Sequence, residues 1–329
     1  MQRPSRRIFI LAAASTAALL SLPRGRAEAG SLLHVWEGRA LGAEARVAIA
    51  SADGARARVL HERIVETLGR IENSLSLYRA DSALVRLNRD GALIDPPAEL
   101  VDVLSAARAV SAASGGAFDP SVQALWDLHA AHFALPGADS SGPSDAAVTG
   151  ALAHVGFAGV DVGRDRVAMA KSGMRLTLNG IAQGYACDRV RDVLRAEGLG
   201  CALVDLGEHR GLGMHPEGRP WRVGVADPRA PWRTIEEIEV GEGAVATSAG
   251  LGTPFEPSGR NHHIFDPRTG RSANHYLSVS VRAPTATLAD AWSTALSVMP
   301  MDEARATLSG RPELKALFVA GDGSRIRVG

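Results

Sequence analysis

LNGIAQGYACD, residues 178–188, places two glycines four residues apart where a predicted strand gives way to a predicted helix. The strand is expected over 174–178 and the helix from 181 to about 197. Glycines at such a junction let the backbone approach another group closely, and a helix N-terminus favours an anion such as a phosphate. Close packing of the helix against a sheet is an alternative reason for the same glycines, and this stretch alone leaves both open.

Around this junction the chain mixes strands and helices without a regular alternation. Strands are expected as a pair over 33–50, around 159–161, at 202–206, 221–225, 235–240, 244–248 and 276–283, and as a hairpin over 318–328. Helices are expected at 54–75, 97–114, 287–298 and 302–308, with a surface loop at 135–144. No internal repeat, G-x-G-x-x-G segment or P-loop is present. The pattern predicts an α+β domain.

The first 29 residues form a segment of their own. Two arginines, Arg6 and Arg7, precede an apolar run over 11–22, and Ala27-Glu28-Ala29 supplies a small-x-small cleavage site. These features predict a twin-arginine signal peptide over 1–29, followed by one domain over 30–329 in the periplasm. An uncleaved anchor is the alternative, but the run is short and Pro23 interrupts it. No later window is apolar enough to cross a bilayer, so the mature chain is expected not to be transmembrane.

Charge and cysteine content limit the partners. Removing five arginines and one glutamate with the signal from 36 basic and 36 acidic residues leaves a net charge of −4. A nucleic-acid partner would call for a basic surface, so none is expected. Cys187 lies early in the helix at 181–197 and Cys201 opens the next strand, which puts the sulfurs roughly 15 Å apart. Both thiols are expected to be free and buried.

Two segments carry side chains suited to chemistry. Asp290 and Thr294 are four residues apart on one predicted helix, so their oxygens project from the same face. Such oxygens suit a hard cation such as Mg²⁺, although an acidic residue near a helix N-terminus is also favoured by the helix dipole alone. His262 and His263 end a short apolar run before a turn, either as a base or as surface residues. Weaker signals are the mixed charges at 205–210 and the small residues at 244–250.

Seven segments, in this order, together resemble the FAD:protein FMN transferases, the ApbE family. They are GRALG at 38–42, the Ser, Tyr, Asp and Asn positions over 76–88, GAFDP at 116–120, GIAQGYACD at 180–188, VATS at 245–248, HIFDPRTG at 263–270 and ADAWSTA at 289–295. The resemblance extends over essentially the whole chain after the signal. It implies a two-lobed α+β fold of mixed and antiparallel sheets with flanking helices and an FAD cleft between the lobes.

The family splits FAD with Mg²⁺ and transfers FMN to a Thr or Ser hydroxyl of a target protein, releasing AMP. By motif, the resemblance implies that Asp290, Thr294 and the carbonyl of Ala182 bind Mg²⁺ and that His263 takes the proton from the target hydroxyl. His262 is expected at the surface or behind the site, because strand alternation turns it to the opposite face. The residues implied in FAD binding are Leu41, Tyr78, Asp119, Gly180, Gly184, Asp188, Glu208, Thr247 and Ser248.

Three positions depart from the common family pattern. Thr177 stands for an Asp, Asn179 for a Gly and Gln183 for a Lys, and the last change removes a positive charge near the implied site. These residues resemble an exported subgroup that includes the nitrous oxide reductase accessory protein NosX. That likeness implies an acceptor in the periplasmic domain of a NosR-like membrane flavoprotein. A Mg²⁺-dependent FAD pyrophosphatase and a non-catalytic flavin-binding assembly protein are the alternatives, and the retained His263, Asp290 and Thr294 argue against the second.

Overall fold

The computed structural model describes residues 32–51 and 53–329, so the predicted signal segment lies outside the described residues. An eight-stranded sheet forms the centre of the molecule, in the order β1-β2-β6-β7-β10-β11-β12-β13. All of its neighbouring strands pair antiparallel. The strands are β1 Leu32–Ala40, β2 Ala43–Ser51, β6 Ala202–Asp205, β7 His209–Leu212, β10 Ala244–Ala249, β11 Ser278–Ala283, β12 Lys315–Val319 and β13 Arg325–Val328.

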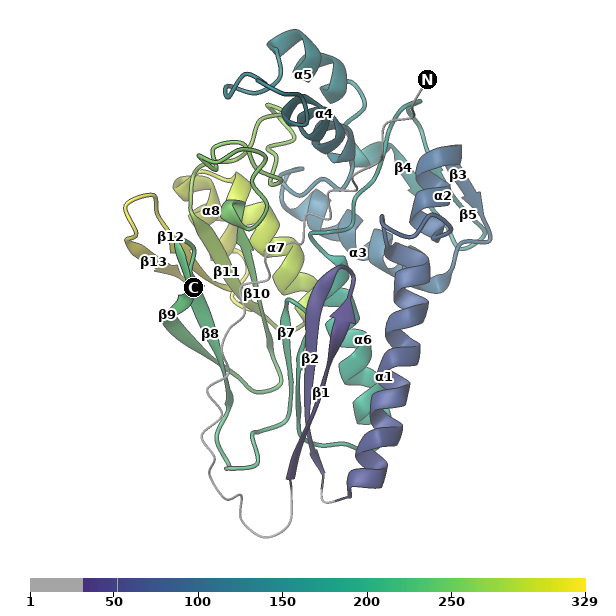
Figure 1. The fold of residues 1–329 in the computed structure, drawn as a ribbon, viewed down its shortest axis with the longest axis vertical. Helices are drawn as coiled ribbons and strands as arrows, with labels where there is room; N and C mark the ends of the chain where they lie inside the picture. The colour runs from purple at the N-terminus through teal and green to yellow at the C-terminus, as the bar shows by residue number, and fades with distance from the viewer. Residues whose placement is uncertain (1–31, 52) are drawn as a thin grey trace.

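The sheet consists of two four-stranded halves joined by a short contact. Between β7 and β10 only two residue pairs form, Ala244 with Arg210 and Val245 with His209. Beyond Val245, strand β10 continues along β11 but has no partner on the β7 side. The sheet is therefore open at one end of this junction, between its two halves (Figure 1).

Three helices cover one face of the sheet (Figure 1). They are α1 Gly54–Leu75 and α6 Ala182–Ala196 over the first half, and α7 Ala286–Val298 over the second. In α1 the side chains of Leu60, Ile64 and Ile71 are buried while Val59 is exposed, so this helix is amphipathic. Asp53 caps this helix by accepting a hydrogen bond from the Ala55 amide at 2.8 Å.

A β-hairpin covers part of the opposite face. It pairs β8 Trp221–Asp227 with β9 Ala230–Val240 and forms a separate two-stranded sheet. Trp221 packs against Ala48 and Leu203 of the first half, and Val223 packs against Val245 of the second. The hairpin thus contacts both halves of the main sheet across their junction.

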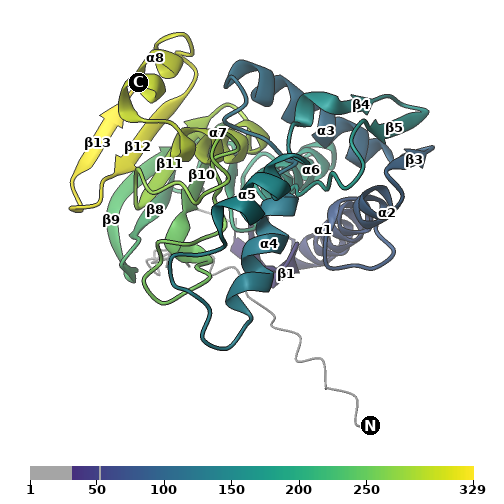
Figure 2. The same ribbon diagram turned by 90° about the horizontal axis from the view of Figure 1, so that it is seen from above.

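The remaining elements lie beyond the open end of the sheet and beside it (Figure 2). They are helices α2 Ala83–Asp90, α3 Ala98–Ala113, α4 Gln123–Phe133, α5 Asp145–Leu152 and α8 Met301–Ser309, the short turns η1 Phe157–Gly159 and η2 Gly250–Gly252, and a small sheet of β3 Ala92–Ile94, β5 Arg166–Met169 and β4 Val160–Val162.

Two sequence-based expectations need correction. The strand predicted at 174–178 does not form, apart from a single bridge between Arg175 and Val122. The side chain of Asn88 bonds both the amide and the carbonyl of Leu176, at 2.7 and 2.8 Å, and so takes the place of a neighbouring strand.

Cys187 and Cys201 are free as predicted, but only Cys187 is buried. Within the described residues, no helix is long and apolar enough to span a membrane.

Candidate active site

A cleft lies where β7 and β10 separate, and most of the residues singled out from the sequence line it. The amide of Thr247 on β10 bridges the opening by donating to Glu208 Oε2, just before β7, at 3.1 Å. The predicted residues that line the cleft are Leu41, Tyr78, Asp119, Gly180, Ala182, Glu208, Thr247, Ser248, His263, Asp290 and Thr294. Of the predicted set, Gly184 and Asp188 do not line it.

Asp290 and Thr294 reach the cleft from the first turns of α7, beside the start of α6. The amide of Gly184 donates to Asp290 Oδ2 at 3.0 Å. A Cβ atom at Gly184 would come within 2.2 Å of the Ala286 carbonyl oxygen. This glycine therefore lets α6 and α7 pack closely together, and that packing holds Asp290 against the first turn of α6.

The cleft is acidic in its interior. Burial raises the pKa of Asp290 to about 7, against the opposing effect of its bond from Gly184. Burial and the neighbouring charge of Asp290 raise the pKa of the Glu208 carboxyl well above its usual range. Among the described residues no lysine or arginine lines the cleft. Two buried carboxyl groups without a basic side chain fit a site for a hard cation, whose charge would let both ionise.

His263 faces the cleft as a neutral imidazole. Burial lowers its pKa to about 4, and a hydrogen bond to the Thr253 carbonyl opposes this shift only in part. That bond joins Nδ1 to the carbonyl oxygen at 3.3 Å, so Nδ1 carries the proton and Nε2 keeps its lone pair. An imidazole in this state is neutral and has a free lone pair at neutral pH, as a general base requires.

His262 does not lie at the surface. It is buried, and a Cβ atom at Gly250 would come within 2.7 Å of its ring nitrogen Nε2. Its Nδ1 accepts from the Ile264 amide at 3.2 Å, and it does not line the cleft. The expectation of a place behind the site agrees with this position, whereas the expectation of a surface residue is wrong, since Gly250 leaves room for the ring inside.

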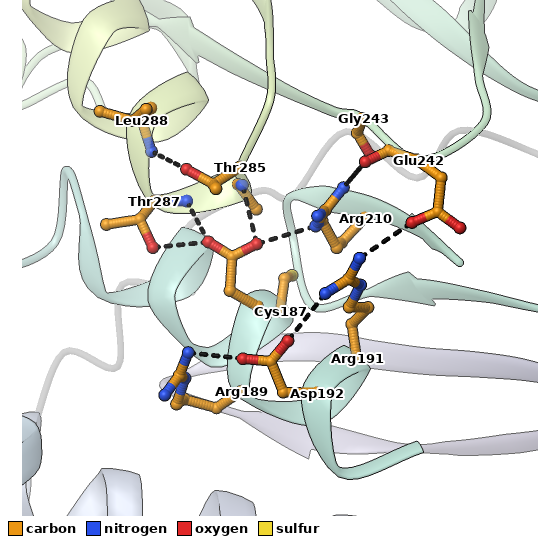
Figure 3. A network of polar contacts seen from close by, with 12 residues as sticks. Cys187, Arg189, Arg191, Asp192, Arg210, Glu242, Gly243, Thr285, Thr287 and Leu288 are labelled. Atoms are coloured by element: carbon orange, nitrogen blue, oxygen red, sulfur yellow. Dashed lines mark hydrogen bonds and ion pairs between the residues drawn. The ribbon is translucent and has the colours of Figure 1, made fainter. Parts of the chain in front are cut away.

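The side chain of Asp188 forms hydrogen bonds to the start of helix α7. Its carboxylate accepts from the amides of Ala286 and Thr287 at 3.0 and 2.9 Å and from the Thr287 hydroxyl at 2.6 Å. Arg210 Nε lies 2.9 Å from the same carboxylate, and Arg210 also donates to the carbonyls of Glu242 and Gly243 (Figure 3). Asp188 thus caps the helix that carries Asp290 and ties it to the junction between the half-sheets.

Three other predicted residues shape the rim. Leu41 has a φ of 51°, in the left-handed region that non-glycine residues seldom adopt, at the tight turn between β1 and β2. Its amide donates to Glu72 Oε1 at 2.8 Å, which holds the turn at the cleft. Asp119 accepts from the Ser121 amide at 2.7 Å and the Phe157 amide at 3.0 Å, so it organises the loop before α4. Tyr78 is 72% exposed and is the one of these rim side chains free to cover a ring.

The departures from the family pattern are also in the cleft. Thr177, Asn179 and Gln183 all line it. Gln183 Nε2 donates to the Leu206 carbonyl at 3.2 Å, which turns this amide towards the β6–β7 turn. A neutral side chain therefore occupies the position where the family pattern has a positive charge.

Some cleft residues were missed in the sequence. Trp126 of α4 and a run along the β8–β9 hairpin line the cleft as well, beside His209 from the weak signal at 205–210; the run comprises Val223, Gly224, Val225, Ala226, Pro228 and Pro231. The alternation in β8 and the two prolines indicated a hairpin. Nothing local could connect that hairpin to the cleft, because it belongs to a separate sheet.

Fold and cleft together define an α+β enzyme in which a neutral imidazole and an acidic, hydroxyl-rich wall share one substrate site. The chain belongs to the ApbE family, whose family model matches residues 41–318. The predicted family and fold class are thereby confirmed.

Curated relatives and solved structures agree with this assignment. The FAD:protein FMN transferase of Salmonella typhimurium is 30% identical over 296 residues, covering 87% of this chain and 83% of the relative. That of Treponema pallidum is 34% identical over 290 residues, covering 81% and 78%. The structure of the ApbE protein from Thermotoga maritima superposes with a TM-score of 0.78 at 33% identity, over 90% of this chain and 97% of that one. The apo flavinyl transferase ApbE of Pseudomonas stutzeri gives 0.76 at 29%, over 91% and 95%.

Proposed function

We propose that this chain transfers FMN from FAD to a Thr or Ser hydroxyl of a target protein, with Mg²⁺ bound and AMP as the leaving group. The curated relatives named above are FAD:protein FMN transferases, which supports the reaction class. The observation that carries the mechanism is the meeting, in one cleft, of neutral His263 with the acidic wall around Asp290.

His263 acts on the incoming hydroxyl. The hydroxyl oxygen attacks the phosphorus of the FMN half, the bond from that phosphorus to the bridging oxygen breaks, and AMP leaves with that oxygen. The proton of the hydroxyl passes to Nε2 of His263, whose Nδ1 is already bonded to Thr253. The Nδ1 bond holds the ring in the basic tautomer, so His263 acts as a general base.

The donor set around Asp290 fits Mg²⁺. The carboxylate of Asp290, the hydroxyl of Thr294 and the carbonyl of Ala182 would hold the ion, and all three residues line the cleft. Bound there, Mg²⁺ would supply positive charge to the pyrophosphate of FAD, which no basic side chain of the described cleft does. The amides at the start of α6 add a partial positive charge at the same place.

Incubation with FAD, Mg²⁺ and a Thr-containing acceptor domain tests the reaction. We expect the acceptor to gain the mass of one phosphoester-linked FMN, with AMP released in equal amount. Release of FMN and AMP at the same rate without an acceptor would instead assign a pyrophosphatase. Binding of FAD with no turnover in Mg²⁺ would assign a flavin-binding assembly protein.

We further propose that residues 1–29 are a twin-arginine signal and that the enzyme acts in the periplasm. Arg6, Arg7 and the apolar run after them support export, and the NosX-like residues support a NosR-like membrane flavoprotein as the acceptor. Replacing Arg6 and Arg7 together by lysine should retain the protein in the cytoplasm and leave a periplasmic acceptor without flavin. An unchanged periplasmic yield would contradict the signal.

A further inference from the structure

Three hydroxyl groups form a line behind the proposed cation site. Ser293 Oγ lies 2.7 Å from Ser248 Oγ, and Ser248 Oγ lies 3.2 Å from Thr294 Oγ1. Ser293 is completely buried and does not line the cleft, whereas Ser248 and Thr294 do. The line therefore starts inside the protein and ends at the cleft.

The direction of the hydrogen bonds in this line follows from its buried end. Ser293 Oγ is 2.8 Å from the carbonyl oxygen of Asp290, which can only accept, so the Ser293 proton must point there. Ser293 then has no proton for Ser248, and Ser248 has to donate to Ser293. With the Ser248 proton used, Thr294 has to donate to Ser248.

This order leaves the lone pairs of Thr294 Oγ1 free for a cation. The space beside that oxygen is kept open by Gly180, where a Cβ atom would come within 2.8 Å of it. A hydroxyl whose proton pointed into the cleft would meet a cation with its positive end. The direction of one proton thus decides whether Thr294 is a good ligand.

We infer that Ser293 is a positioning residue for the proposed Mg²⁺ site, acting through Ser248 to fix the proton of Thr294 away from the cleft. The inference rests on the proposed function, because it assumes a cation at Asp290 and Thr294. Binding of the cation to Thr294 makes its hydroxyl a stronger donor to Ser248, so the line and the ion stabilise each other. Without Ser293, the Ser248 proton is free to turn towards Thr294, which drives the Thr294 proton into the cleft.

The test compares two serines of the same helix. Ser297 Oγ donates to the Ser293 carbonyl at 2.7 Å and is buried, so Ser293→Ala and Ser297→Ala each remove one buried hydroxyl that bonds back to the helix. Alanine favours the helix, so both variants should fold. Of these two serines, Ser293 alone hydrogen-bonds Ser248. Mn²⁺ serves as the probe, and the signal of the free ion in electron paramagnetic resonance is titrated with each protein in the presence of FAD and without acceptor.

We expect Ser293→Ala to weaken Mn²⁺ binding by about ten- to a hundredfold, the scale of a lost partner behind a metal ligand, and Ser297→Ala to leave it unchanged. The affinity for FAD without metal should be the same in all three proteins. Equal Mn²⁺ affinity of Ser293→Ala and the native chain would overturn this inference and leave the proposed function unaffected. If Asp290→Ala bound Mn²⁺ as tightly as the native chain, the proposed cation site would be wrong, and the inference with it.

Discussion

At the scale of single residues, two adjacent histidines differ because only one of them reaches the cleft. Both are held neutral by burial, which lowers each pKa to about 4. We expect His263→Ala to bind FAD normally but to transfer FMN at least about a hundredfold more slowly, the typical scale of a lost general base. His275→Ala, an exposed histidine of the same segment, is the control and should transfer normally. Acceptor labelling followed by mass spectrometry measures both.

The pH profile gives a second readout for the same base. A pKa lowered from 6.5 to about 4 means that neutral His263 dominates above about pH 4 and is lost as the pH falls through that value. At saturating Mg²⁺, His263 should therefore cause no inflection in kcat/KM between about pH 6 and pH 8. If His263→Ala transferred FMN at the native rate, His263 would not be the general base.

The raised pKa of Asp290 predicts that the stability of the fold changes with pH. Its pKa is raised from 3.8 to about 7, so its contribution to stability is present below about pH 4 and is lost as the pH rises through about 7. Asp290→Asn cannot ionise, so the metal-free variant should be more stable than the native chain at pH 8 by on the order of 2 to 4 kcal/mol. The difference should vanish near pH 4. Urea denaturation with a chelator present measures it.

The same variant should lose its response to Mg²⁺. Asparagine retains an oxygen for the Gly184 amide but brings no negative charge to the cation. We expect FAD turnover by Asp290→Asn to be slow and insensitive to added Mg²⁺. A variant no more stable than the native chain at pH 8, yet still activated by Mg²⁺, would contradict both the raised pKa and the metal assignment.

At the scale of elements, helix α7 is held at its N-terminus by a carboxylate from α6. Asp188→Ala should destabilise the fold by about 3 to 5 kcal/mol, because it leaves Arg210 buried without its partner. Asp192→Ala removes an acidic residue from the same helix, but of its two partners Arg189 is exposed and Arg191 also pairs with Glu242, so it should cost less than about 1 kcal/mol. Chemical denaturation compares the two. Weaker FAD binding with unchanged stability would instead make Asp188 the cofactor contact implied by the family pattern.

Helices with a clear amphipathic pattern could be predicted from the sequence, and extended segments less well. Helix α1 runs from Gly54 to Leu75 as expected, because its capping and its buried face are both local. Strand β9 begins at Ala230, five residues before the predicted start. Its first residues could not be predicted as a strand because they are exposed and lack an apolar alternation. The extended segment at 174–178 resembles a strand locally, but its partner is the side chain of Asn88, 88 residues away from Leu176.

At the scale of the whole molecule, the sequence predicted most of the motif residues that meet in the cleft, but not the strands that enclose it. The seven matched segments supplied nearly all predicted residues that line the cleft, and they do so because family motifs record which residues meet. The separation of β7 from β10 could not be predicted, because it depends on where pairing stops between strands more than thirty residues apart. The hairpin wall at Val223–Pro231 was missed for the same reason.

The position of the cleft between two half-sheets predicts that FAD and Mg²⁺ stabilise the protein jointly. Glu208 belongs to one half of the sheet, while Thr247 and Asp290 lie on the other, and without a metal the charge of Asp290 opposes ionisation of Glu208. Under the proposed function, the phosphates of FAD would supply oxygens to the cation and the cation would offset their charge, so each should bind more tightly when the other is present. A ligand at a hundredfold excess over its Kd adds about 2.7 kcal/mol, and coupling makes the pair exceed the sum of the two alone.

Thermal unfolding with FAD, with Mg²⁺ and with both measures this coupling, in the absence of an acceptor. We expect the rise in Tm with both ligands to be clearly larger than the sum of the separate rises, and we expect a single transition, because residues of both half-sheets line the cleft. Asp290→Asn should keep the rise caused by FAD and lose the excess. Purely additive shifts in the native chain would mean that cation and FAD occupy independent sites, and the cleft at the β7–β10 junction would then bind only one of them.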